Sequence, residues 1–354
     1  MSCLLDLHRE MVEGHSRRVG TVLLLFMLAP LAWIYGLVNR IRVLSFQNGF
    51  RSVYRCRASV VSVGNLTVGG TGKTPMVDFL VRFWLEQGKR VAVVSRGYKG
   101  EGGHGVQLVS VDSPVEVVGD EPLLLAKRNP EAVVIVARKR RIGVEQAVEH
   151  HQADVVILDD GFQHLQVDRD MDIVLLDAAR PFGNGLPLPA GNLREFPSAL
   201  KRADILIHTR SADHDSCVAG FTGPQFHSSH RLDNVATRLE GGSIPLEELS
   251  GKRIVAFAGI ANPDKFFQAL VGVGIELAAR IPFPDHVRYT QNLLDRLFEE
   301  AGRADYLLTT EKDGVKLQPK CFPVPCLTVG MTLDFGSFRE QLIEVVKKLE
   351  VRNR

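Results

Sequence analysis

The sequence predicts an α/β protein with a mostly parallel sheet, a second and smaller α/β lobe toward the C-terminus, and an N-terminal membrane helix. Three observations lead to this fold class. An uncharged apolar run covers residues 19–38, a strand, a glycine-rich loop and a helix follow one another over residues 58–88, and β-branched strands alternate with helical stretches as far as residue 309. Such alternation is typical of parallel, doubly wound sheets.

The length of 354 residues is enough for two domains. We expect an anchor helix with basic flanks at 1–45, a nucleotide-binding domain at 46–240 and a smaller α/β lobe at 250–354. The net charge of +2 argues neither for nor against a polyanionic partner, and no motif calls for nucleic acid. The five cysteines are scattered without metal-site spacing, which favours a reducing, cytosol-facing compartment.

The run Val19–Val38 has the length of a membrane-crossing helix, roughly 30 Å. Trp33 and Tyr35 lie near one end, where aromatic rings favour the headgroup layer. A cleaved signal peptide fits poorly, because basic residues follow the run instead of a small-residue cleavage site. A buried core helix is the alternative. Basic residues flank both ends and Pro30 sits inside, so a full span and an oblique position in one leaflet both stay open.

The glycine-rich loop has the form of a P-loop, as in NTPases. The strand Ala58–Val63 leads into G-N-L-T-V-G-G-T-G-K-T, and a helical pattern begins at Pro75 and ends at Gly88. Backbone N–H groups and the helix N-terminus of such a unit hold phosphate oxygens. The expected nucleotide-binding residues of the loop are Thr67, Gly69, Gly70, Thr71, Gly72, Lys73 and Thr74.

Two residues of this loop have further expected roles. Lys73 supplies a cation to the phosphates, and Thr74 offers its hydroxyl to Mg²⁺. Thr67 stands where the generic pattern has glycine.

A second motif typical of nucleotide-phosphate sites is the pair Asp159 and Asp160, which ends the strand that begins with Val155–Leu158. This is the form of a Walker B element, in which a carboxylate at the end of a strand holds Mg²⁺ directly or through water. Ligands of open α/β sheets bind at the carboxyl ends of the strands, which suits this position. A turn or a helix cap is the alternative for paired aspartates.

The rest of the sequence predicts the remaining strands of the two lobes. After a linker near Gly241–Gly251, the chain starts again with a strand, a turn and a helix from Asp264. The further expected strands are Val91–Val94, Val133–Val136, Ile173–Leu176, Ile205–His208, Arg253–Ala258 and Tyr306–Thr309. The glycine-dense stretch up to Gly105 is expected to be a loop or hairpin near the site, with a simple surface turn as the alternative.

Eight motifs in series make the sequence specific. In order they are S-V-G-N-L-T-V-G-G-T-G-K-T-P (62–75), S-R-G-Y (95–98), G-D-E-P (119–122), A-R-K-R-R (137–141), L-D-D-G-F-Q-H (158–164), N-L-R-E (192–195), F-P-D-H (283–286) and T-E-K-D (310–313). Together they resemble the tetraacyldisaccharide 4'-kinase family, the lipid A 4'-kinases of Gram-negative bacteria. Thr67 matches this family's own loop, although it breaks the generic one.

The resemblance implies an ATP- and Mg²⁺-dependent kinase of lipid A biosynthesis. Its acceptor would be the 4'-hydroxyl of a tetraacylated glucosamine disaccharide 1-phosphate, a lipid that stays in the membrane. The resemblance places the enzyme at the bacterial inner membrane, with its catalytic domain facing the cytoplasm. The anchor helix would then dock the catalytic domain on the inner-membrane lipid surface, and its arginines would attract anionic headgroups.

The resemblance also implies roles for individual residues. Asp120 and His286 look like the family's pair for activating the sugar hydroxyl, and Lys73 completes the catalytic set. Asp160 and Glu195, with Thr74, would be the groups around the metal. The arginines that would bind anionic groups of ATP or of the acceptor's 1-phosphate are Arg138, Arg140 and Arg141.

Simpler interpretations stand beside these roles. His286 alone is typical of a surface or turn histidine, and Asp120 before Pro122 is typical of a helix cap. The arginines fit a solvated face equally well. Many relatives have a second histidine after His286, where this chain has Val287, so that position receives no role.

Two other functions compete with the kinase. A P-loop GTPase or metallochaperone-type NTPase would carry an N/T-K-x-D guanine-reading motif, to which T-E-K-D at 310–313 is a near miss. Such an enzyme has no use for a bilayer-length anchor. A nucleotide-binding membrane scaffold without catalysis is the other alternative. The T-E-K-D motif receives no role from the sequence.

Overall fold

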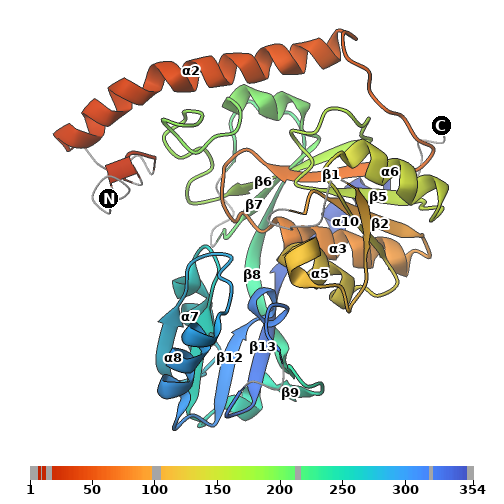
Figure 1. Cartoon of the computed structure of the whole chain (residues 1–354). Coiled ribbons are helices and arrows are strands. Elements are labelled where there is room, and N and C mark those ends of the chain that lie inside the picture. The colour runs from red at the N-terminus through yellow and green to blue at the C-terminus, as the bar shows by residue number, and fades with distance from the viewer. Residues whose placement is uncertain are drawn as a thin grey trace. The chain divides into compact units, whose positions relative to one another are not determined.

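The computed structural model describes residues 7–8, 10–12, 18–97, 105–211, 217–318 and 322–348. The chain forms two compact units (Figure 1). The first unit comprises Met1–Arg96, Lys139–Ser229 and Asp334–Arg354, and the second comprises Gly97–Arg138 and His230–Leu333. Tyr98 of the predicted S-R-G-Y motif and the glycine-dense stretch to His104 lie outside the described residues.

The first unit begins with the long helix α2, Val19–Gln47, which Figure 1 shows as a single red rod. It is longer than the predicted apolar run, because the residues after Val38 continue the helix, and Pro30 lies inside without ending it. In the part of the chain that the structure describes, α2 is the one helix long and apolar enough to cross a membrane. Most of its apolar side chains are exposed, including Phe26 and Ile34. Most of the surface of α2 is therefore exposed, which excludes the alternative of a buried core helix.

A parallel sheet forms the centre of the first unit. Its strand order is β7-β6-β1-β5-β2, and the first residues of β8 pair in parallel with β7. These strands are runs of buried, mostly β-branched residues, as expected for a sheet covered on both faces. Their bounds are β1 Ser59–Asn65, β2 Val91–Ser95, β5 Val155–Asp159, β6 Met171–Asp177, β7 Ile205–Thr209 and β8 Gln225–Arg238.

Helices cover this sheet. α3 packs on β1, β2 and β5, and α6 packs on β2 and β5. The last segment of the chain also belongs to this unit, because the ring of Phe335 lies 5.1 Å from that of Phe79 on α3. The bounds are α3 Lys73–Glu86, α6 Arg140–Glu149, α10 Arg339–Lys347, and the 3-10 helices η1 Pro197–Arg202 and η4 Gly336–Phe338.

The second unit has its own sheet, with the order β11-β10-β12-β13-β8, and β9 pairs with β8. Alternate residues of β10 point to opposite faces, so Ala256 packs in the cluster of α7 and Phe257 in that of α8. The two helices therefore cover opposite faces. The bounds are β9 Ser243–Pro245, η2 Leu246–Leu249, β10 Ile254–Ala258, α7 Pro263–Gly272, β11 Leu277–Pro282, α8 Gln291–Ala301, β12 Tyr306–Thr310, α9 Glu311–Gly314 and β13 Cys326–Asp334.

Residues 97–138 add a hairpin and two helices to the second unit. β3 pairs antiparallel with β4, and α5 packs on β3, β4 and α9. The bounds are β3 Val106–Val109, α4 Val115–Val118, α5 Asp120–Arg128 and β4 Val133–Ala137.

The predicted fold class is confirmed: the sheet is mostly parallel, helices cover it, and an apolar helix lies near the N-terminus. The compact units divide the chain differently from the predicted domains: residues 1–45 and 334–354 belong to the first unit, and residues 97–138 and 230–240 belong to the second. The predicted linker near Gly241–Gly251 holds β9 and η2 instead, because β8 is long enough to form a hairpin with β9.

Candidate active site

The phosphate loop lies between β1 and α3. Gly72 has a φ of 86°, a left-handed conformation that favours glycine, and Lys73 is the first residue of α3 rather than a loop residue. Inside the loop, the Asn65 side-chain amide donates to Thr71 Oγ1 at 3.0 Å and to the Gly69 carbonyl at 3.3 Å. The loop is thus folded around Asn65, with the helix N-terminus and its unpaired N–H groups behind it.

The Walker B carboxylates end β5, as the sequence predicts. Asp159 accepts a hydrogen bond from Ser95 Oγ at 3.1 Å, and Asp160 has a φ of 53°. A left-handed backbone at a non-glycine residue is costly and is concentrated at functional sites. Burial raises the pKa of Asp160, but the charges of Lys73 and Arg194 outweigh it and hold that pKa below its ordinary value. Asp160 is therefore a carboxylate at neutral pH.

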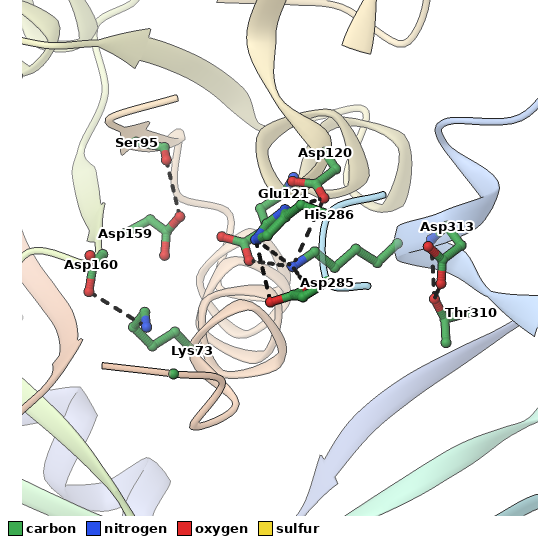
Figure 2. A network of polar contacts seen from close by, with 12 residues as sticks. Lys73, Ser95, Asp120, Glu121, Asp159, Asp160, Asp285, His286, Thr310 and Asp313 are labelled. Atoms are coloured by element: carbon green, nitrogen blue, oxygen red, sulfur yellow. Dashed lines mark hydrogen bonds and ion pairs between the residues drawn. The ribbon is translucent and has the colours of Figure 1, made fainter. Parts of the chain in front are cut away.

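Asp160 links the phosphate loop to a residue that the sequence did not single out. Lys73 Nζ lies 3.6 Å from Asp160 Oδ1 (Figure 2). Arg194 Nη1 donates to both oxygens of the same carboxylate, at 2.8 and 2.7 Å. Arg194 belongs to the N-L-R-E motif from which the sequence analysis selected only Glu195.

Glu195 has a different partner. Its two carboxylate oxygens accept from Arg202 at 2.9 and 3.0 Å, and Arg202 in turn lies over the ring of Phe162, 4.7 Å from its centroid. Glu195 is buried in this arrangement. The structure thus ties Glu195 to η1, whereas Asp160 is tied to Lys73 and Arg194.

The three predicted anion-binding arginines have three different environments. Arg140 is buried and donates to the Asp159 carbonyl at 2.9 Å, so it holds the end of β5. Arg141 lies over the ring of Tyr54, 5.4 Å from its centroid. Arg138 is exposed and belongs to the second unit. The structure does not gather them into one cluster.

In the second unit, Asp120 and His286 are in contact. His286 Nδ1 and Asp120 Oδ2 are 2.8 Å apart, and Asp120 Oδ1 accepts from the Glu121 backbone N–H at 3.0 Å. Asp120 is the first residue of α5, where the helix dipole favours a negative charge. Burial raises its pKa, but the hydrogen bond from His286 and the charge of Lys312 outweigh it, so the pKa lies below its ordinary value.

A lysine stands beside this pair. Lys312 Nζ lies 3.5 Å from His286 Nε2, 3.0 Å from Glu121 Oε1, 3.9 Å from Asp285 Oδ1 and 4.0 Å from Asp120 Oδ2. Burial lowers the pKa of Lys312, but the three carboxylates outweigh it and raise it, so the ammonium stays charged. In the tautomer in which Nε2 accepts from the Lys312 ammonium, the ring proton of His286 lies on Nδ1 and faces Asp120.

The neighbouring residue of the T-E-K-D motif has a structural role. Asp313 is fully buried and accepts from the Gly259 backbone N–H at 2.9 Å, from Thr310 Oγ1 at 2.8 Å and from Lys316 Nζ at 2.8 Å. A guanine-reading aspartate must offer its oxygens to the base. The carboxylate of Asp313 already holds the turn after β10, so the motif does not form a guanine site.

Sequence reasoning missed Arg194, Lys312 and Arg210. Arg210 follows β7, donates to the Gly70 carbonyl of the phosphate loop and pairs with Asp177. The available signal was position, since each of the three residues follows a strand or lies in one of the quoted motifs. Among the described residues, no group of three or more His, Cys, Asp or Glu side chains forms a metal cluster.

Comparisons with known proteins point to one family. The profile of LpxK, described as tetraacyldisaccharide-1-P 4'-kinase, matches residues 24–347. The tetraacyldisaccharide 4'-kinase of Syntrophotalea carbinolica is 47% identical and covers 95% of this chain and 96% of its own length. That of Geobacter sulfurreducens is 43% identical, covering 90% and 91%.

A solved structure agrees. LpxK from Aquifex aeolicus, an "apo" form in complex with ATP, superimposes with a TM-score of 0.77 at 31% identity, covering 92% of this chain and 99% of the other. The chain therefore belongs to the tetraacyldisaccharide-1-P 4'-kinase family.

Proposed function

We propose that the chain uses Gly69–Thr74 to hold ATP with Mg²⁺, and the Asp120–His286 pair to activate the 4'-hydroxyl of a membrane-held tetraacylated disaccharide 1-phosphate. Membership of the family confirms the predicted enzyme class, a 4'-kinase of lipid A biosynthesis, and does not support the GTPase alternative. The observation that carries the residue roles is the Lys73–Asp160 contact at the carboxyl edge of the parallel sheet.

ATP is the phosphoryl donor, in line with the ATP complex of the Aquifex aeolicus relative. The proposed cradle is the loop backbone and the N-terminus of α3, which favour phosphate oxygens. Lys73 supplies a positive charge to the transferring group as negative charge shifts to the leaving oxygen. Arg210 holds the Gly70 carbonyl, which keeps the loop in shape while the nucleotide binds.

Mg²⁺ fits the oxygen ligands of the first unit. The Thr74 hydroxyl lies in the first turn of α3, and Asp160 is ionised. Hydroxyl and carboxylate oxygens suit this hard cation, which keeps several waters and binds nucleotide phosphates as well. Bound Mg²⁺ would neutralise charge on the β- and γ-phosphates. Glu195 would bind the metal only if it released Arg202, so the proposed role of Glu195 as a metal ligand depends on breaking that ion pair.

The acceptor hydroxyl needs a base. Asp120 is ionised and held by the Nδ1–H of His286, so the pair accepts a proton at neutral pH. In the proposed step, the acceptor oxygen forms a bond to the γ-phosphorus, the bond to the bridging oxygen of ADP breaks, and the hydroxyl proton passes to the pair. Lys312 balances the negative charge of three neighbouring carboxylates.

The lipid acceptor and the apolar helix α2 belong together. A multiply acylated lipid stays in a bilayer, and α2 is a candidate membrane anchor. We propose that the protein sits at the inner membrane and faces the cytoplasm. Cys56, Cys217 and Cys326 are free thiols, which agrees with a reducing compartment.

The test is phosphoryl transfer. Purified protein in detergent, supplied with γ-labelled ATP, Mg²⁺ and the tetraacylated disaccharide 1-phosphate, is expected to label the lipid at the 4'-position. A substrate already phosphorylated at that position is the control and should remain unlabelled. Folded protein that binds ATP but labels no lipid would contradict the proposal and favour a nucleotide-binding scaffold.

A further inference from the structure

α2 contacts the rest of the first unit along one narrow stripe. In the C-terminal half of the helix, Ala32, Gly36, Val43 and Phe46 are buried, and Asn39, Arg42 and Ser45 are half-buried. Their spacing of three and four residues places them on one face. The residues between them, such as Ile34 and Val38, are exposed and apolar. One face of α2 therefore packs on protein, while the others are free to face lipid.

At Gly36 this stripe packs very closely against the rest of the first unit. A Cβ atom added to Gly36 would lie 2.2 Å from Cε2 of Phe196, a distance that atoms do not tolerate. The Phe196 ring also lies 5.2 Å from that of Trp33. Phe196 follows directly after Arg194 and Glu195. At Gly36, α2 thus packs tightly on the segment that carries the Asp160 partner.

Two polar side chains of α2 bind backbone carbonyls beyond this contact. The Asn39 side-chain amide donates to the Arg194 carbonyl at 3.2 Å. Arg42 Nη2 donates to the Gln163 carbonyl at 2.5 Å. A helix that served only as a tether would need neither contact.

Arg194 and Gln163 both reach the phosphate site. Arg194 donates its backbone N–H to the Leu66 carbonyl at 2.7 Å and its guanidinium to Asp160. Gln163 donates its side-chain amide to the Asn65 carbonyl at 2.9 Å and accepts from Arg194 Nη1 at 3.4 Å. Asn65 and Leu66 immediately precede the phosphate loop, and Asn65 holds Thr71. Each residue held by α2 therefore contacts the two residues that lead into the loop.

We propose that α2 is a positioning element of the nucleotide site: through Asn39 and Arg42 it fixes Arg194 and Gln163, and through them the phosphate loop and Asp160. The helix thus contributes to ATP use even when no membrane is present. The inference rests on the proposed assignment of the loop as the ATP site. Asn39 and Arg42 act as positioning residues, since neither is proposed to touch nucleotide or acceptor.

The test compares Arg42→Met with Arg40→Met in detergent, where membrane attachment plays no part. Both variants lose one positive charge from the same turn of α2. Arg42 donates to the Gln163 carbonyl, whereas exposed Arg40 makes no hydrogen bond to a backbone carbonyl within the described residues. Arg42→Met is expected to raise the dissociation constant for ATP about tenfold and to lower kcat, with the KM for the acceptor unchanged. Arg40→Met is expected to keep its ATP affinity within about twofold.

Two further variants keep the result interpretable. Arg42→Lys retains a donor for the Gln163 carbonyl and is expected to recover most of the ATP affinity. Asn39→Ala should show the same direction of change as Arg42→Met, to a smaller extent, because a neutral hydrogen bond contributes less than a charged one. Thermal melts give the folded fraction, so ATP affinity is compared per folded molecule.

The outcomes separate this inference from the proposed function. If Arg42→Met and Arg40→Met bind and use ATP alike in detergent, or differ only in lipid vesicles, α2 is a tether and the inference fails. The same holds if Arg42→Met only lowers the melting temperature while its folded fraction binds ATP normally. If the unchanged protein itself neither binds ATP nor labels lipid, the proposed function fails instead.

Discussion

His286 Nδ1 lies 2.8 Å from Asp120 Oδ2, although 166 sequence positions separate the two residues. His286 has a φ of 58°, which is uncommon for a residue other than glycine. Gly119, which precedes Asp120, has a φ of 89°, a conformation that glycine adopts readily. A strained backbone that the surrounding fold maintains is typical of functional positions. The pair is therefore the first place to test the proposed chemistry.

Asp120→Asn is expected to lower kcat about 100-fold or more, because the amide cannot accept the hydroxyl proton. The asparagine oxygen still accepts from His286 Nδ1, so folding should be preserved. ATP affinity should stay within about twofold, since the loop of the first unit holds the nucleotide. Steady-state transfer and ATP binding measure the two quantities, with Asp295→Asn on the exposed side of α8 as the control. A kcat near that of the control would remove Asp120 from the mechanism.

The pH dependence tests the lysine beside the pair. The pKa of Asp120 lies below its ordinary value, because the His286 hydrogen bond and the Lys312 charge outweigh burial. A base works when it is ionised, so activity is present above this pKa and is lost as the pH falls through it. Lys312→Met removes a cation and raises the pKa, so its activity should be lost at a higher pH than in the unchanged protein.

The measurement is kcat/KM for the acceptor across the acid range, for Lys312→Met, Lys312→Arg and Lys252→Met. Lys312→Arg keeps the charge and should retain the original profile. Lys252→Met removes an exposed lysine and controls for overall charge. An unshifted acid limb in Lys312→Met would show that the lysine has only a structural role.

Lys73→Ala should reduce phosphoryl transfer by about 100-fold or more, because it removes the cation nearest the phosphate loop and a partner of Asp160. ATP affinity should fall as well. Cys217→Ala is the control, since Cys217 is exposed and has no place in the proposed mechanism. An equally deep loss in Cys217→Ala would mean that the site has been assigned to the wrong residues.

Magnesium titration distinguishes the two proposed acidic ligands. Chelation of divalent cations should abolish transfer, and added Mg²⁺ should restore it. Asp160→Asn is expected to shift the Mg²⁺ midpoint about tenfold upward. Glu195→Gln should do the same only if Glu195 exchanges Arg202 for the metal. If the midpoint stays unchanged and the melting temperature falls, Glu195 supports η1 through Arg202 and is not a ligand.

Gly64→Ala tests the packing beneath the site. An added Cβ would lie 2.5 Å from Phe162 Cβ and 2.9 Å from its backbone nitrogen, so β1 must separate from the segment after β5. The melting temperature should fall by several degrees, as overpacking costs about 1–3 kcal/mol. Gly272→Ala has open space and ordinary backbone and should melt like the unchanged protein. Equal melting temperatures would show that the Phe162 contact relaxes without cost.

Local patterns predicted the parts of this protein that local chemistry determines. The P-loop appeared as strand, glycine loop and helix, and eight strands were found to within about two residues, because β-branched runs and glycine breaks are local signals. The strands β3, β8, β9, β11 and β13 were not predicted. Helix α2 extends to Gln47 instead of Val38, since arginine and asparagine continue a helix that hydropathy alone ends.

Residues whose roles depend on tertiary contacts were not predicted. The sequence analysis grouped Glu195 with Asp160, whereas Arg194 is the residue that contacts Asp160 and Glu195 pairs with Arg202 of η1. Lys312 of α9 gains its role only when α5 and the segment after β11 bring three carboxylates to it, those of Asp120, Glu121 and Asp285. Arg140 and Arg141 are neighbours in sequence, yet α6 sends one to the β5 carbonyl and the other to Tyr54.

Each of the two units is built from separate segments of the chain, which affects how the protein folds during its synthesis. The phosphate loop leaves the ribosome early, but the unit that contains it is complete only when α10 and the Phe335–Phe79 contact form. Helix α5 likewise packs on α9, which is translated more than 180 positions later. Neither unit can finish folding during most of translation, so nascent chains expose apolar surface and an unanchored α2 together. Growing chains of this protein should therefore depend on chaperones and on early delivery to the membrane.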